Sequence, residues 1–303
     1  MRKILPKIMA VAMLFNSGIV NAERTYISKI DNHAIVNSVL VSDKVTTEPV
    51  LPENTNNFGF SKIECGGYHC YAIKNSNLYS VGNNQFGQLG REGKVSQSTW
   101  GVVNGMSGVT DIAAGMYHGY AIKDNQIYSV GYGGDGQLGR SGVATTWGLV
   151  DGMSGITTTI AAGGNQGYAI KDSQLYSVGD NRFGQLGRAG DQLKWGLVSG
   201  ISGITAIECG IYHCYAIKDN NLYSVGYNDY GQLGRAGTTN QSTWAIVDGM
   251  SGVKNVISGG YHGYVIDEGN IYSVGNNEHG QLGLGDTSSR SEFTPLDPAT
   301  LVE

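Results

Sequence analysis

A four-residue string, Gly-Gln-Leu-Gly, recurs along this chain and constrains its fold more than any other feature. It occurs five times, opening at residues 87, 136, 184, 231 and 280, at intervals of 49, 48, 47 and 49 residues. Self-similarity at so regular a period is typical of a solenoid or a propeller, in which each repeat is one supersecondary unit.

Each repeat follows one plan. A run led by Trp, such as Trp100 to Val103, opens the unit, and a Gly-Met-Ser-Gly turn leads to Val109–Ala114. A Tyr-His turn, the run 119–123, an Asp-Asn turn and the run 126–131 follow, and a Gly-rich loop with Gly-Gln-Leu-Gly closes the unit. These short runs of Val, Ile, Tyr and Thr between turn residues predict strands. Four short strands per unit, joined as a meander, predict an all-β propeller; a linear β-solenoid is the alternative.

Composition agrees with such a fold. The chain has 303 residues, of which 47 are Gly and 15% are charged. Glycine in a helix interior costs about 1 kcal/mol, so this content argues against a mostly helical protein. The net charge of −5 and the lack of a basic block argue against nucleic-acid binding.

The repeated pattern resembles the regulator of chromosome condensation repeat. The resemblance rests on Gly-x-Tyr-His-x-Tyr-Ala-Ile, then Tyr-Ser-Val-Gly, then Gly-Gln-Leu-Gly, as in 65–90 and 209–234, and covers roughly residues 47–296. It implies a β-propeller of four-stranded blades that serves as a binding scaffold. The family commonly has seven longer repeats, and often has Pro where Trp100, Trp147, Trp195 and Trp244 stand here.

The number of blades follows from length. Five units are explicit, and residues 292–297 resemble the opening strand of another blade. At the other end, 26–30 and 34–41 are typical of a hairpin. A sixth blade built from both termini would close the ring and remove exposed sheet edges, so we expect six blades, with five or seven as alternatives.

The N-terminus has the pattern of an export signal. Residues 1–22 combine Arg2, Lys3 and Lys7 with the apolar run 8–15 and end at Ala22. This pattern predicts a secretory signal peptide, and the run is too short for a membrane span. We therefore expect a periplasmic or secreted protein with an N-terminal segment at 23–46 and a propeller at 47–303.

The four cysteines form two local pairs, each in the frame Cys-Gly-x-Tyr-His-Cys. The other units have Ala or Ser and Gly at both places, so a unit has both cysteines or neither. Facing residues of a hairpin lie within disulfide reach, and export permits oxidation. The pattern predicts the disulfides Cys65–Cys70 and Cys209–Cys214 rather than a metal site.

No motif for catalysis or for a cofactor is visible. Histidine recurs in the Tyr-His turn at 69, 118, 213 and 262, and arginine follows Gly-Gln-Leu-Gly at 91, 140, 188 and 235. Repetition in nearly every unit favours a structural role for both sets over a ligand site. We expect a protein that is not an enzyme, with no cofactor and no bound metal.

The loops before each Gly-Gln-Leu-Gly vary while the strands barely change. In a propeller these loops lie on one face, and aromatic residues are typical anchors of binding surfaces. The predicted binding residues are Phe86, Tyr132, Asp135, Arg182, Phe183, Tyr227, Asp229, Tyr230, Glu278 and His279. Neutral drift of loop sequence is the alternative interpretation.

These features favour an exported binding protein whose loops engage a macromolecule, and we expect that macromolecule to be a protein. Enzyme inhibition or host interaction would be concrete forms of this role. One alternative, implied by the resemblance, is an exchange factor acting on a host small GTPase, although the uniform units leave little room for an inserted wedge. A glycan-binding lectin is the other alternative, since aromatic loops suit sugar stacking. Oligomeric state is not predicted.

Overall fold

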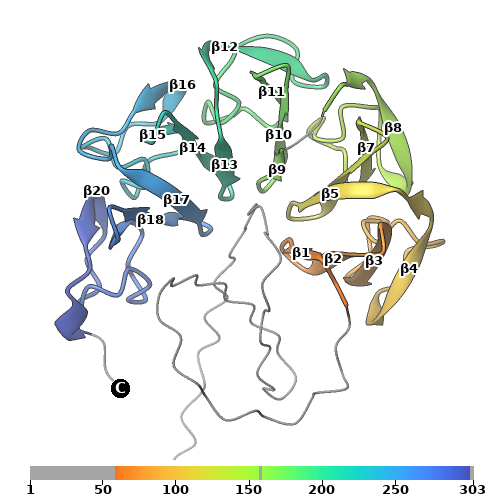
Figure 1. Ribbon diagram of the computed structural model, residues 1–303, viewed down its shortest axis with the longest axis horizontal. Coiled ribbons are helices and arrows are strands. Elements are labelled where there is room, and N and C mark those ends of the chain that lie inside the picture. The colour runs from red at the N-terminus through yellow and green to blue at the C-terminus, as the bar shows by residue number, and fades with distance from the viewer. Residues whose placement is uncertain (1–58, 157–158, 301–303) are drawn as a thin grey trace, which may run out of the picture. The chain divides into compact units, whose positions relative to one another are not determined.

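The computed structural model describes residues 59–156 and 159–300, and it confirms an all-β propeller built from four-stranded blades. Within these residues the strands form five antiparallel sheets, and each sheet packs against the next in chain order (Figure 1). The predicted signal peptide and N-terminal hairpin lie outside the described residues. Closure of the ring as a sixth blade therefore stays a prediction.

All five blades share one topology, a meander of four strands. The first blade comprises β1 (Lys62–Cys65), β2 (His69–Lys74), β3 (Asn77–Gly82) and β4 (Gln97–Ser107). The second comprises β5 (Val109–Ala114), β6 (His118–Lys123), β7 (Gln126–Gly131) and β8 (Ala144–Ser154). The third comprises β9 (Ile160–Ala162), β10 (Gln166–Lys171), β11 (Gln174–Gly179) and β12 (Gly196–Ser202).

The remaining two blades repeat this order. The fourth comprises β13 (Ala206–Cys209), β14 (His213–Lys218), β15 (Asn221–Gly226) and β16 (Gln241–Ile246). The fifth comprises β17 (Val253–Ser258), β18 (His262–Asp267), β19 (Asn270–Gly275) and β20 (Arg290–Pro295), followed by the short 3-10 helix η1 (Pro298–Thr300). In each blade the first strand lies toward the centre and the fourth at the periphery (Figure 1).

The structure corrects the predicted order of strands within a unit. The Trp-led run does not open a blade: it is the fourth, outer strand of the blade that precedes it, because β4 pairs with β3 and β8 with β7. For the same reason residues 292–297 do not begin a new blade. Most of them belong to β20, which pairs with β19 and completes the fifth sheet.

The hydrophobic core lies between blades. One cluster joins Tyr168 and Ile170 of the third blade to Ile207 and Val225 of the fourth, and three similar clusters join the other neighbouring pairs. Because both faces of a blade are covered, the second strands are buried almost continuously: five of the six residues of β6, β10 and β14 are buried. This explains why Tyr-Ala-Ile is apolar without alternation.

Tight turns join the second and third strands. Asp124 and Asn125 both have positive φ, 52° and 58°, as do the equivalent residues of the first, third and fourth blades. Two consecutive positive φ values are typical of the type I′ turn that matches the twist of a β-hairpin. These turns therefore place the Tyr-His turn and the variable loop at one end of each hairpin, and the Asp-Asn turn at the other.

Candidate functional site

Each variable loop is fastened to its own blade by hydrogen bonds from invariant parts of the repeat. The buried hydroxyl of Tyr71 donates to the carbonyl of Gln88, and Ser80 Oγ donates to the carbonyl of Leu89 at 2.9 Å. The Gln88 side chain in turn accepts the backbone N–H of Phe86 at 3.0 Å. The same three bonds recur in the other four blades. These hydrogen bonds hold each loop in a defined position on its blade.

The Tyr-His turns form a second row beside the loops. Backbone hydrogen bonds link the turn of one blade to that of the next, for example from Gly67 N–H to the Gly115 carbonyl at 3.2 Å and from Ile211 N–H to the Gly260 carbonyl at 3.1 Å. Each loop is also tied to its own turn, as by Tyr132 N–H and the Tyr117 carbonyl at 2.9 Å. This arrangement places the residue before each His next to the variable loop of the same blade.

The first aromatic cluster spans the first two blades. It consists of Tyr68, Phe86, Tyr117 and Tyr132. Tyr68 stacks on Tyr117 with centroids 5.4 Å apart, and Phe86 lies 5.0 Å from Tyr117 and 5.1 Å from Tyr132. Tyr68 is 57% exposed, and the other three side chains are half-buried.

The second aromatic cluster spans the third, fourth and fifth blades. It consists of Phe183, Tyr212, Tyr227, Tyr230 and Tyr261. Phe183 lies 4.9 Å from Tyr227 and 5.1 Å from Tyr212, and Tyr230 lies 5.5 Å from Tyr261. All five side chains are half-buried. Their packing is edge-to-face or tilted, which aromatic rings prefer to direct stacking.

Polar side chains lie between the two clusters, and we call Asp135, Asn165, Asp180 and Arg182 the polar bridge. The third blade has Asn165 where the others have Tyr, and its amide donates to Asp135 Oδ2 at 2.9 Å and accepts from Gln137 at 3.3 Å. Arg182 pairs with the buried carboxylate of Asp180 at 2.7 Å, and its guanidinium lies 5.9 Å from the centre of the Tyr212 ring. The hydrogen bond and charge of Asp180 raise the pKa of Arg182.

The structure therefore brings most of the predicted residues onto one face. Phe86 and Tyr132 join the first cluster, Phe183, Tyr227 and Tyr230 the second, and Asp135 and Arg182 the bridge. Asp229, Glu278 and His279 are exposed, and His279 makes no ring contact with either cluster within the described residues.

Four aromatic members of this face escaped prediction. Tyr68, Tyr117, Tyr212 and Tyr261 precede the His of their turns, and the prediction, which considered only the loops before Gly-Gln-Leu-Gly, did not include them. The signal that could have found them is Asn165, the one departure at this place in the repeat. The turn of the third blade keeps its backbone hydrogen bond, from Gly163 N–H to the Gln166 carbonyl at 2.9 Å, so Tyr is not required to shape the turn.

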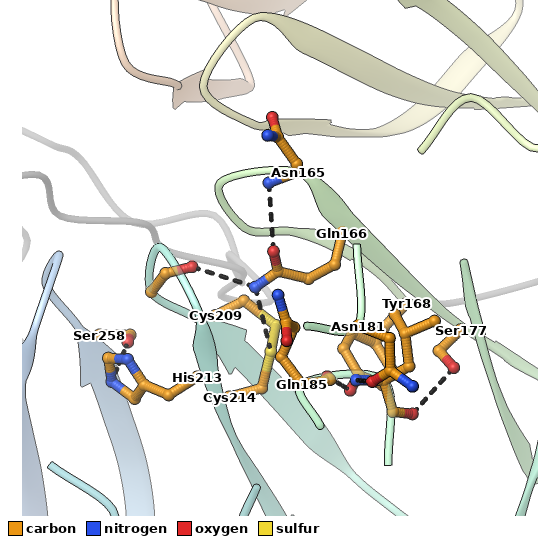
Figure 2. The surroundings of a disulfide bond; sticks show 12 residues. Asn165, Gln166, Tyr168, Ser177, Asn181, Gln185, Cys209, His213, Cys214 and Ser258 are labelled. Carbon is orange, nitrogen blue, oxygen red and sulfur yellow. Dashed lines mark hydrogen bonds between the residues drawn. A yellow bond between two sulfur atoms is a disulfide. The ribbon is translucent and has the colours of Figure 1, made fainter. Parts of the chain in front are cut away.

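Both predicted disulfides are confirmed. Cys65 pairs with Cys70 and Cys209 with Cys214, each with Cα atoms 4.1 Å apart and each in direct register across the first two strands of its blade. Figure 2 shows the second disulfide with Gln166 of the third blade reaching toward it. The Gln166 amide donates to the Gly210 carbonyl at 3.3 Å, and lies 3.9 Å from Cys214 Sγ.

The recurring histidines are internal. His69, His118 and His213 are buried, and burial lowers the pKa of each to about 3. His213 Nε2 lies 3.2 Å from Ser258 Oγ of the next blade (Figure 2). Within the described residues no three His, Cys, Asp or Glu side chains converge as metal ligands.

Two of the arginines after Gly-Gln-Leu-Gly, Arg140 and Arg188, bind backbone carbonyls within their own blades. Arg188 donates to the carbonyls of Ser177 in β11 and Lys194 ahead of β12, at 2.9 and 2.8 Å. Arg140 joins the carbonyls of Ser129 and Thr146 in the same way. They link the third strand to the segment that leads into or forms the fourth, which agrees with a structural role.

Comparison with known proteins agrees with this architecture. One model of the regulator of chromosome condensation (RCC1) repeat matches residues 75–122 and 268–302, and a second model of that repeat matches 60–88 and 204–232. No curated protein matches the sequence significantly. Within the described part of the chain, no helix has the length and apolarity that crossing a membrane requires.

Solved structures show the same fold at low sequence identity. Human WBSCR16 is 21% identical over 78% of this chain and 67% of its own, with a TM-score of 0.70. Prp20p from Saccharomyces cerevisiae, a protein studied for its binding to Gsp1p and histones, is 20% identical over 80% of this chain and 78% of its own, with a TM-score of 0.64. Yeast Prp20 bound to Kap60 gives a TM-score of 0.65 at 20% identity, over 80% of this chain and 76% of its own.

Proposed function

Because the chain belongs to the RCC1 repeat family of β-propellers, we propose that it is an exported, non-enzymatic protein that binds another protein through its aromatic face. We define the aromatic face as the two aromatic clusters and the polar bridge between them. The family relationship supports a binding scaffold, and solved relatives of the same fold have protein partners: Prp20p binds Gsp1p and histones, and Prp20 has been captured with Kap60.

The observation that carries the proposal is the density of aromatic side chains, one exposed and eight half-buried, on hydrogen-bonded loops and turns. Nine Tyr and Phe residues from five blades form two clusters, and within each cluster the rings contact one another. Tyr is among the residues that dominate the energetics of protein interfaces. Because hydrogen bonds already hold the loops, little conformational entropy would be lost on binding, which favours affinity.

Export is supported by the two disulfides, since such bonds persist in oxidising compartments. Inhibition of an enzyme and interaction with a host are concrete forms of the proposed role. Both would use the same face, so one set of variants tests them together.

The test is affinity capture from envelope and culture fractions with the wild-type protein and with Phe183→Ala combined with Tyr230→Ala. We expect a stoichiometric protein partner whose affinity falls about 30-fold or more in the double variant, as for the loss of interface anchors. The matched control is Leu149→Ala combined with Leu197→Ala, which removes two exposed apolar side chains from outer strands. Urea unfolding of both variants shows whether the fold is retained.

Three outcomes would contradict the proposal. One is the absence of any partner at stoichiometric level, and another is undiminished capture by the Phe183 and Tyr230 variant. The third is a different activity at the same face: accelerated release of a fluorescent nucleotide from a small GTPase would indicate an exchange factor, and saturable binding on a glycan array would indicate a lectin.

A further inference from the structure

The charge of the aromatic face is one-sided. The Tyr-His turns (66–69, 115–118, 163–166, 210–213 and 259–262) contain no Asp, Glu, Lys or Arg. The variable loops (83–88, 132–137, 180–185, 227–232 and 276–281) contain four acidic residues and one Arg: Asp135, Asp180, Asp229, Glu278 and Arg182. The loops and turns that carry the aromatic face are therefore acidic as well as aromatic.

The chain itself shows how a cation is held on this face. Arg182 donates from Nε to both carboxylate oxygens of Asp180 at 3.0 Å, while its guanidinium lies over the ring of Tyr212. A carboxylate neutralises the charge and an aromatic ring covers it, which is a favourable arrangement for a guanidinium. Asp180 is thereby already neutralised.

The other three carboxylates have no such partner. Asp135, Asp229 and Glu278 make no ion pair with another residue of the described chain. Asp135 accepts a hydrogen bond from the neutral Asn165 amide, and after the hydrogen bond and charge of Asp180 its charge also helps to raise the pKa of Arg182, although the two form no ion pair. Asp229 lies beside Tyr227, where burial and then the hydrogen bond and charge of Asp229 raise the pKa of that hydroxyl to about 12. Within the described chain Asp229 and Glu278 thus have no cation paired with them, and Asp229 lies beside a tyrosine ring.

We infer that the partner of the aromatic face presents Lys or Arg side chains, which would bind among these carboxylates and tyrosine rings as Arg182 does between Asp180 and Tyr212. This inference rests on the proposed function and deepens it by assigning the partner's charge. Complementary charge of this kind raises association rates and rejects partners of the wrong sign.

The experiment measures fluorescence anisotropy of labelled peptides on the full-length protein. The probes are a short peptide that alternates Arg with Gly and the same peptide with Glu in place of Arg. We expect saturable binding of the Arg peptide, at least about tenfold tighter than any binding of the Glu peptide, and weaker at high NaCl because exposed charges are screened.

The decisive variant is Asp135→Asn, Asp229→Asn and Glu278→Gln in one chain, and we expect it to weaken the Arg peptide about tenfold. Its control, Asp124→Asn with Asp172→Asn and Asp219→Asn, removes the same charge at the opposite end of the β-hairpins, where Asn also tolerates positive φ. The control should stay within about twofold of wild type.

Two results would overturn the inference. The first is equal or tighter binding of the Glu peptide, and the second is equal loss in the face variant and its control. Neither result by itself contradicts the proposed function, which is that the aromatic face binds a protein. In the capture experiment, the Phe183 and Tyr230 variant could lose the partner while the carboxylate variant retains it. That result would mean that the protein binds through its aromatic face but that its partner does not present the proposed positive charge.

Discussion

Trp147 of β8 lies edge-on against Tyr71 of the preceding blade, with ring centroids 5.3 Å apart. The same contact joins Trp195 to Tyr120 and Trp244 to Tyr168, and Phe293 takes the place of Trp against Tyr215. Since each of these tyrosines also holds the Gly-Gln-Leu-Gly loop of its own blade, one residue connects the stability of the propeller to the geometry of the aromatic face.

Replacing Trp195 by Ala should destabilise the protein by about 3 kcal/mol, because it removes a large ring from the boundary of the second and third blades. Urea unfolding followed by far-ultraviolet circular dichroism measures the change. Thr146→Ala, at an exposed position of an outer strand, is the control and should change stability by less than about 0.5 kcal/mol. Equal midpoints for the two variants would argue against the inter-blade contact.

Gly90→Ala should lower the free energy of unfolding by more than the cost of placing Ala at a positive φ. Gly90 has φ 62°, and an added Cβ would lie 2.1 Å from Nε1 of Trp147. Gly93 has φ 83° with nothing within 4 Å, so Gly93→Ala isolates the backbone cost, about 1–2 kcal/mol. We expect Gly90→Ala to exceed Gly93→Ala by at least about 1 kcal/mol in denaturant unfolding, because overpacking adds to the backbone cost. A smaller difference would mean that Trp147 moves aside without cost.

As the pH is lowered, the propeller should begin to lose stability near pH 6.5, above the pH range in which carboxylates titrate. The buried histidines have a pKa of about 3 in the folded chain, against 6.5 as the ordinary value. Between those two values the unfolded chain binds more protons, so the free energy of unfolding falls as pH falls. Each histidine contributes about 1.4 kcal/mol per pH unit below about pH 6.

His118→Gln tests this assignment, because the third blade already has Gln166 at the equivalent position. The variant should lose between about a quarter and a third of the histidine-dependent change between pH 6.5 and 5, because His69, His118 and His213 contribute alike and burial also lowers the pKa of His262. An unchanged slope would show that His118 is protonated in the folded chain or that other groups dominate.

Each disulfide should stabilise the chain by about 2 kcal/mol, the chain-entropy value for so short a loop. Cys65→Ala with Cys70→Gly reproduces the pair Ala114 and Gly119 of the second blade, so the substitution fits the repeat. Unfolding with and without dithiothreitol measures the contribution of the bond. The reductant should lower the midpoint of wild type more than that of the variant, and equal shifts would contradict a role for this disulfide.

Local sequence patterns predicted much of the molecule. Strand and turn residues at a regular period indicated a propeller, and the paired cysteines indicated hairpin disulfides, because both depend on residues a few positions apart. Neighbouring strands in a meander and facing residues of a hairpin are close in space because they are close in sequence. The Asp-Asn turns were predicted by the same kind of local rule.

Where a blade begins could not be predicted in this way. A periodic pattern has no starting point, and the Trp-led strand is adjacent in sequence both to the blade before it and to the blade after it. Its pairing with the preceding strand, as in Tyr128 with Leu149, was decided by hydrogen bonding within the folded sheet. The same uncertainty caused residues 292–297 to be assigned to a further blade.

The sequence by itself thus determined the class of fold, its repeating unit and its cross-links, since these follow from local propensity and period. Only the tertiary structure decided which side chains meet on one face. Tyr68, Phe86 and Tyr117 come from two different blades, and Arg182 and Tyr212 from the third and fourth. Such contacts depend on how neighbouring blades pack, which burial between their faces sets and which no single repeat encodes.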